Sequence, residues 1–182
     1  MPTIYIDMDG VVADFERAAR QIIKVEAGEL HKDKNNYWPR EQWEQLLAYP
    51  HLYRILHKMP DADRMIALAR GFRDELGWEL RMLTAIPRKN DFPFVFQDKI
   101  AWMQEYYPDI PVFFGPYSED KHRFCQTHQD ILVDDRVSNC EEWRQAGGRA
   151  VLVEEACYEQ ALAELKILLY QARAKIFLFK SE

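Results

Sequence analysis

The chain has 182 residues, of which 48% are hydrophobic and 13% aromatic, and this composition excludes a disordered chain. The net charge of −6 argues against a broad nucleic-acid surface, although a small anionic substrate held by local cations remains compatible with it. No apolar run approaches the roughly 20 residues of a membrane span. The start of the chain does not resemble a signal peptide, and the three cysteines are widely spaced, so we expect a soluble cytoplasmic protein with reduced thiols and no membrane partner.

The first predicted strand ends in a pair of acidic residues. Residues 3–6 are apolar or β-branched, and Asp7, Asp9 and Gly10 follow directly. Because Asp and Gly are poor strand residues, the strand should end at Asp7, at the edge where parallel sheets place their ligands. The same composition also occurs in ordinary turns. The apolar strand before it and the helical pattern after it favour a catalytic interpretation.

The next segment, residues 15–58, contains no strand signal. Helical spacing over residues 15–25 predicts a helix that ends at Gly28, and Pro39 suits the first turn of a second helix that reaches about Tyr49. We interpret this segment as a small helical insertion.

Strands and helices alternate through the rest of the chain. Helices are expected over residues 61–76, 94–107, 137–146 and 158–174, a short helix or turn over 119–127, and strands over 78–84, 111–114, 130–134 and 149–153. Asp61 or Asp63 can cap the first of these helices, and Ile100, Trp102 and Met103 are expected to be buried in the second. Short apolar strands that alternate with helices predict an α/β fold with a parallel sheet covered on both faces.

The apolar tail at residues 176–179 is compatible with three structures. It can extend the last helix, add an edge strand, or contact a partner, including a second copy of the chain in a homodimer. The residues alone do not choose among them.

Polar groups stand at the ends of three predicted strands, and a parallel sheet would bring these ends to one edge. They are Asp7 with Asp9, Thr84, and Asp134 with Asp135, while Lys121 lies on the element before the last pair. Each of these residues alone would be read as structural. Four acids at one edge require a cation, so together they predict Mg²⁺ beneath a phosphate group.

Each of these side chains then has a chemical role. Asp7 is the candidate nucleophile, which would form an aspartyl phosphate, and Asp9 is the candidate general acid and base. Thr84 and Lys121 are expected to bind phosphoryl oxygens, and Asp134 to complete the metal site. Asp135 is expected either to support the metal from the second coordination sphere or to orient Lys121.

These motifs, in this order, resemble those of the haloacid dehalogenase-like (HAD) phosphohydrolases over nearly the whole chain. The runs around Asp9, Trp38, Lys99 and Asp134 are most similar to the 5′(3′)-deoxyribonucleotidase group. The resemblance implies a Rossmann-like core formed by residues 1–14 and 59–182, with a helical cap at 15–58. It also implies Mg²⁺ bound by Asp7, the backbone carbonyl of Asp9, and Asp134. An aromatic pocket for the base would include Phe15, Tyr37 and Trp38, although plain core packing explains Phe15 and Trp38 equally well.

Two positions depart from the nucleotidase pattern. Ala85 stands where the group has a serine that helps to hold phosphate, and Glu119 stands where it has an arginine. Arg88, Lys89 or Arg123 would have to compensate for the lost positive charge. The residues of phosphoryl transfer are retained, so the departures bear on the substrate more than on the chemistry.

We therefore expect a Mg²⁺-dependent phosphatase of nucleotide metabolism that acts on a deoxynucleoside monophosphate. The alternatives are a sugar phosphate or another metabolite, a 3′-phosphate at a nucleic-acid end, which the negative charge disfavours, and a regulatory phosphate-binding protein without turnover. A receiver domain would place its phosphoacceptor after the acid pair, and a P-loop ATPase needs a glycine-rich motif that this sequence lacks.

Overall fold

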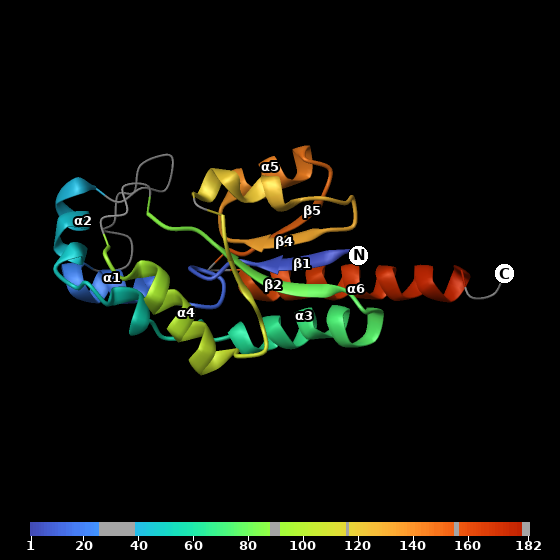
Figure 1. Cartoon of the computed structure of the whole chain (residues 1–182), viewed down its shortest axis with the longest axis horizontal. Coiled ribbons are helices and arrows are strands. Elements are labelled where there is room, and N and C mark those ends of the chain that lie inside the picture. Colours follow the sequence, from blue (N-terminus) through green and yellow to red (C-terminus); the bar gives the residue numbers. More distant parts are fainter. Residues whose placement is uncertain (26–38, 88–91, 116, 155–156, 180–182) are drawn as a thin grey trace.

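The computed structural model describes residues 1–25, 39–87, 92–115, 117–154 and 157–179, the last five by their backbone alone. Five parallel strands form one sheet in the order β3-β2-β1-β4-β5 (Figure 1). Their bounds are Thr3–Ile6 for β1, Glu79–Thr84 for β2, Val112–Phe114 for β3, Ile131–Asp134 for β4 and Arg149–Leu152 for β5. The predicted α/β fold with a parallel sheet is confirmed.

Alternate residues of the central strand β1 supply two separate cores. Ile4 and Ile6 pack in the larger core, under α3 (Ala62–Leu76) and α6 (Tyr158–Phe179). Tyr5 faces the other side and makes an edge contact with Trp143 of α5 (Val137–Gln145), with the ring centroids 5.2 Å apart. The two faces of the sheet are therefore both covered, α3 and α6 on one side and α5 on the other (Figure 1). This burial explains why residues 4–6 of β1 and 131–133 of β4 are continuous apolar runs.

Two helix ends differ from the predictions. Helix α1 (Phe15–Ile23) ends at Lys24, which adopts a left-handed backbone with φ 55°, so it is shorter than expected, and Gly28 lies outside the described residues. Asp61 occupies the first position before α3, but its side chain does not cap the helix and instead accepts a hydrogen bond from Arg64 at 2.9 Å. Gly77 does end α3, with φ 70°.

Helix α4 (Val95–Tyr106) buries a different set of residues from the one expected. Trp102 and Met103 are buried as predicted, but Ile100 is 40% exposed, so that prediction was wrong. Lys99, one position earlier, is fully buried instead. The helix is oriented so that Lys99, and not Ile100, faces the sheet. This orientation lets Lys99 contact Asp9 and Thr84 at the sheet edge.

The segment between β1 and α3 is helical in its described part. It contains α1, α2 (Arg40–Leu47) and the 3₁₀ turn η1 (Leu52–Arg54), which lie beyond one end of the sheet (Figure 1). The chain leaves and re-enters the core at adjacent points, because Asp14 N–H donates to His57 O at 2.8 Å and Met59 N–H donates to Val12 O at 2.9 Å. These bonds support the proposed division into a core (1–14 and 59–182) and a cap (15–58).

The C-terminal tail continues the last helix, since α6 extends to Phe179 and projects past the sheet (Figure 1). Residues 176–179 therefore extend the last helix and do not form an edge strand, while a contact of this tail with a partner stays a prediction. Among the helices of the described chain, none has the length and apolar character required to cross a membrane.

Candidate active site

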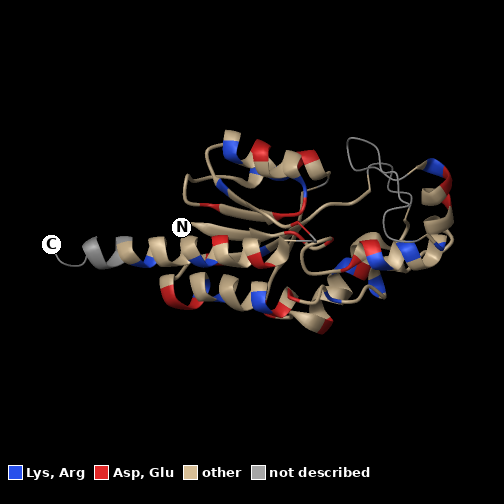
Figure 2. Ribbon diagram, turned by 180° about the vertical axis from the view of Figure 1, so that it is seen from behind, with Lys and Arg blue, Asp and Glu red and all other residues tan. Residues whose placement is uncertain are grey.

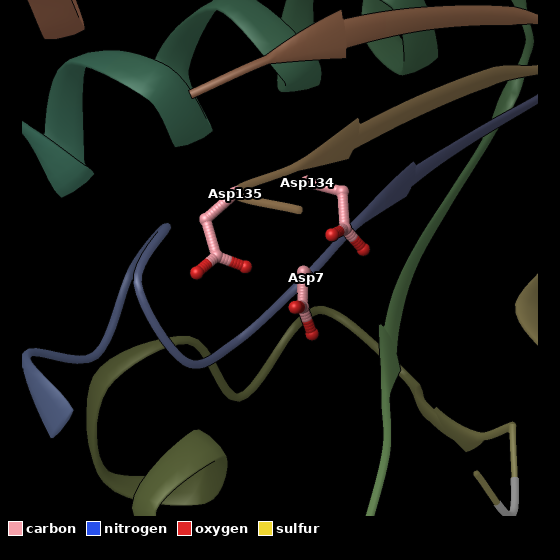
Figure 3. A group of neighbouring side chains, drawn as sticks. All are labelled: Asp7, Asp134 and Asp135. Carbon is pink, nitrogen blue, oxygen red and sulfur yellow. The ribbon is translucent and has the colours of Figure 1, made fainter. Parts of the chain in front are cut away.

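Three carboxylates meet where β1 and β4 end. Asp7 follows β1, and its backbone N–H still donates to Val133 O of β4 at 2.9 Å, which keeps it beside Asp134 at the end of β4. One oxygen each of Asp7, Asp134 and Asp135 lies within 4.8 Å of the others, and Figure 3 shows the three side chains beside one another near the ends of β1 and β4. The register of the parallel sheet thus brings together acids that are more than a hundred residues apart in the sequence.

Lys121 bridges two of these carboxylates. It lies on the 3₁₀ segment η2 (Ser118–Phe124), is almost fully buried, and places its Nζ 2.8 Å from Asp7 Oδ2 and 2.7 Å from Asp134 Oδ2. Burial alone would lower the pKa of Lys121, but the charges of Asp134 and Asp7 outweigh it and raise the pKa. The ammonium therefore stays charged and directly beside the candidate nucleophile.

The remaining contacts hold Asp134 in one orientation. Its Oδ1 accepts hydrogen bonds from the backbone N–H of Arg136 and from Asn139 Nδ2, both at 2.9 Å. Asp7 is held in a similar way, since its Oδ1 accepts from Met8 N–H at 2.7 Å. Both carboxylates are thus oriented before any substrate or metal arrives.

The acids are only partly neutralised by the neighbouring lysine. Burial raises the pKa of Asp135 to about 8, and the charges of Asp134 and Asp7 add to this effect. Burial also raises the pKa of Asp134, although Lys121 opposes the shift. Burial and mutual repulsion disfavour the charged form of these carboxylates, and a bound divalent cation would offset both effects. Carboxylate oxygens are the ligands that Mg²⁺ prefers. The donor set present therefore fits Mg²⁺.

Gly10 leaves space for Asp135. It has φ 78°, and a Cβ at this position would lie 2.6 Å from Asp135 Oδ2. The residue after the acid pair must therefore be glycine for two separate reasons, its backbone conformation and its closeness to a carboxylate.

A second cluster joins Asp9 to Thr84 through Lys99. Lys99 Nζ lies 2.6 Å from Asp9 Oδ2, 2.7 Å from Thr84 Oγ1 and 2.9 Å from the carbonyl oxygen of Ala85. Asp9 Oδ1 is buried and has no hydrogen-bond partner among the described residues. Burial raises the pKa of Asp9, against the charge of Lys99, which is the direction that a general acid needs.

Sequence reasoning did not identify Lys99 as a site residue, although a signal was present. Val95, Lys99, Trp102 and Met103 follow helical spacing, which places the lysine on the buried face of α4. Asp98 is buried on the same face and contacts His51, and a charge within such a stripe indicates a buried partner.

Of the predicted aromatic pocket, only Phe15 can be placed. Phe15 stacks on Tyr53 with ring centroids 5.5 Å apart, and Tyr53 makes an edge contact with Phe92 at 5.4 Å. The Tyr53 ring also lies under Lys99 Nζ, 4.8 Å from the ring centroid, so this aromatic cluster adjoins the Asp9 side of the site. Tyr37 and Trp38 lie outside the described residues.

Both positions that depart from the nucleotidase pattern, Ala85 and Glu119, are described, and so is Arg123 among the candidate compensating cations. The Ala85 carbonyl accepts from Lys99, and Arg123, 73% exposed, forms its ion pair with Asp120 at 3.3 Å. Arg88 and Lys89 fall outside the described residues. Lys121 makes its ion pairs with Asp7 and Asp134, so of the two roles considered for Asp135, orienting Lys121 is not supported by these contacts.

Comparison with known proteins identifies the family. The model described as "5′ nucleotidase, deoxy (Pyrimidine), cytosolic type C protein" matches residues 1–167. The chain belongs to this family. It is accordingly a hydrolase of the phosphatase type, as the sequence resemblance implied.

One of two similar solved structures agrees at the level of the fold. A putative β-phosphoglucomutase from Thermotoga maritima is 18% identical, with 96% of this chain and 99% of that chain covered and a TM-score of 0.54. A HAD family enzyme from Bacteroides thetaiotaomicron, in complex with magnesium and inorganic phosphate, is 12% identical over 85% of this chain and 95% of that chain, with a TM-score of 0.45. Of these two, only the first exceeds 0.5, and at its identity it shows the fold alone. A search of curated proteins gave no significant match.

Proposed function

We propose that this protein is a Mg²⁺-dependent phosphomonoesterase that works through an aspartyl phosphate on Asp7 and acts on deoxynucleoside monophosphates. The observation that carries the proposal is the convergence of Asp7, Asp134 and Asp135 beside Lys121 at one sheet edge. This arrangement offers a nucleophile, a cation site and a buried ammonium within one small volume.

The first half-reaction transfers the phosphoryl group to the protein. A carboxylate oxygen of Asp7 attacks phosphorus, the bond between phosphorus and the ester oxygen breaks, and Asp9 gives its proton to the departing alkoxide. Lys121 and Thr84 are the groups proposed to meet the phosphoryl oxygens as negative charge spreads over them. Mg²⁺, held by Asp7, Asp134 and the backbone carbonyl of Asp9, would offset the repulsion between the phosphate and the acids.

The second half-reaction returns Asp7 to its free state. Asp9, now a carboxylate, takes a proton from water, the water oxygen attacks phosphorus, and the bond between Asp7 and phosphorus breaks to release inorganic phosphate. Desolvation raises the pKa of Asp9 from its ordinary value, which favours the protonated form that the general acid needs.

The substrate assignment rests on the family and on the aromatic cluster of Phe15, Tyr53 and Phe92. A planar base stacks well on such rings. Ala85 and Glu119 favour a second candidate, another small phosphomonoester such as a sugar phosphate, because both replace groups that hold phosphate in the nucleotidase pattern. We also propose a cytoplasmic location, which the free cysteines and the description of the family support. A homodimer is a further proposal.

Phosphate release from a panel of nucleoside monophosphates and sugar phosphates, with and without Mg²⁺, tests this function. We expect turnover that requires Mg²⁺ and is fastest with a deoxynucleoside monophosphate. Faster turnover of a sugar phosphate would select the second candidate. If no ester is hydrolysed, the remaining hypothesis is a regulatory protein that binds phosphate without turnover.

The Asp7→Asn variant tests the nucleophile. It should lose on the order of 10³-fold or more in kcat, because an amide does not attack phosphorus, while its circular dichroism stays that of the unchanged protein. Asp109→Asn, the same chemical change at a surface ion pair, should keep full activity. Near-normal turnover by the Asp7 variant would exclude the proposed nucleophile.

A further inference from the structure

Lys99 is a buried charge with no role in the mechanism above. Its side chain is fully buried on α4, and its ammonium lies among Asp9, Thr84 and the Ala85 carbonyl, at 2.6, 2.7 and 2.9 Å. A buried lysine is costly unless it is paired, so the fold must hold it there for these partners.

The number of donors on the ammonium limits what Lys99 can do. An ammonium has three N–H donors, and each of the three contacts takes one. None remains for a phosphoryl oxygen, so Lys99 is not arranged to bind the substrate. Any effect on the reaction must pass through the groups that it holds.

We propose that Lys99 is a positioning residue that holds the general acid Asp9 and the phosphate-binding hydroxyl of Thr84 in their working orientations. The inference rests on the proposed function and extends it to a residue without direct contact with substrate. Asp9 depends on this contact, because its side chain is 30% exposed and its Oδ1 has no hydrogen-bond partner within the described chain. Without Lys99, the carboxyl group would be free to rotate toward solvent.

The surroundings of Lys99 are rigid enough for this role. Trp102, three residues along α4, is fully buried and its indole Nε1–H donates to the Leu56 carbonyl at 2.8 Å. The ring of Tyr53 lies under the ammonium. The lysine is therefore fixed by a packed helix and can hold Asp9 to one position.

The role predicts that the effect of removing Lys99 depends on the leaving group. A nucleoside 5′-alkoxide needs a proton as it departs, whereas p-nitrophenolate departs without one. A misplaced Asp9 should therefore slow phosphoryl transfer from the nucleotide much more than transfer from p-nitrophenyl phosphate. The ratio kcat/KM reports this first transfer without the later hydrolysis step.

The experiment compares Lys99→Met with the unchanged protein on both esters at saturating Mg²⁺, with Lys166→Met on the surface of α6 as control. We expect kcat/KM of Lys99→Met to fall about 100-fold with the nucleotide and less than about 10-fold with p-nitrophenyl phosphate, since general acid catalysis contributes 10²–10⁴-fold. The control should match the unchanged protein. Equal losses with the two esters would overturn the proposal, and no turnover by the unchanged protein would instead refute the proposed function.

A second comparison keeps the proposal testable if Lys99→Met does not fold. Asp9→Asn and the double variant Asp9→Asn with Lys99→Met differ only in the lysine, and the double variant leaves no unpaired charge between these two positions. If Lys99 acts through Asp9, the two should have nucleotide kcat/KM values within about 3-fold, as expected for residues in one unit. A further loss of tenfold or more in the double variant would show that Lys99 acts mainly through a group other than Asp9, such as Thr84, and would overturn the role assigned to its contact with Asp9.

Discussion

At the scale of single residues, the turn after β1 is the most constrained part of the site. Gly10 has a left-handed backbone, and its missing side chain leaves space for the Asp135 carboxylate. Gly77 has a similar φ of 70° at the end of α3, but a Cβ there would meet nothing within 4 Å. An alanine at Gly77 would therefore cause backbone strain alone, whereas an alanine at Gly10 would cause the same strain and also a clash with Asp135.

Gly10→Ala and Gly77→Ala should differ in both stability and activity. Each should lose about 1 kcal/mol of unfolding free energy from the positive φ. Gly10→Ala should lose more, because the new methyl group displaces Asp135, and should need a higher Mg²⁺ concentration for half-maximal activity. Urea unfolding and a Mg²⁺ titration of phosphate release measure the two effects. Identical Mg²⁺ dependence in the two variants would mean that Asp135 does not influence the cation site.

At the scale of elements, the strand ends could be predicted from the sequence but the position of Lys99 could not be fully anticipated. β1 and β4 are short apolar runs followed by acids, and parallel strands bring such ends together whatever lies between them. Lys99 is buried by partners 90 and 15 residues away, so the local pattern showed only that a charge lay on an apolar face. The same distant contacts explain why Ile100, which is apolar, faces solvent.

An ion-pair network joins α3 to the loop before β3. Asp109 accepts from Arg70 Nε at 3.0 Å and from Arg73 Nη1 at 2.8 Å. The hydrogen bonds from Arg70, with those from Arg73, lower the pKa of Asp109 from 3.8 to about 2. Because the folded pKa is the lower one, the pairing stabilises the fold above pH 3.8, and this stabilisation is lost as the pH falls toward 2.

Asp109→Asn should therefore destabilise the protein at neutral pH but not in strong acid. We expect a loss of about 1 kcal/mol or less, since Asp109 is partly exposed and solvent screens the pair. The difference between the two proteins should stay constant from pH 7 to pH 4 and narrow below pH 4, as measured by urea unfolding at each pH. A difference that grows in acid would contradict the assigned pKa direction.

At the scale of the whole molecule, one sheet separates two cores and carries the site at its edge. Acidic and basic residues are interspersed along the described helices (Figure 2). An extended polyanion would require a continuous basic surface, so this distribution suits a small substrate. Cys140 lies in the smaller core beside Trp143, whereas Cys157 is exposed near the start of α6.

The three thiols should report on this packing. Burial raises the pKa of Cys140 to about 12 and also raises the pKa of Cys125. At pH 8 we expect Cys157 to react rapidly with a thiol reagent, Cys125 slowly, and Cys140 only after unfolding in urea. Mass spectrometry of the labelled peptides assigns each site. Rapid labelling of Cys140 in the native protein would contradict a closed core on this face of the sheet.

The central claim is that the phosphoryl group is transferred covalently to Asp7. Trapping this acyl phosphate tests the claim most directly. The Asp9→Asn variant lacks the base for the second half-reaction, so p-nitrophenyl phosphate and Mg²⁺ should leave Asp7 phosphorylated. Acid quenching and borohydride reduction would then convert that residue to homoserine, which peptide mass spectrometry locates. We predict homoserine at position 7 only when both ester and Mg²⁺ are present. Release of p-nitrophenol with Asp7 unmodified, or with another residue modified, would contradict the account.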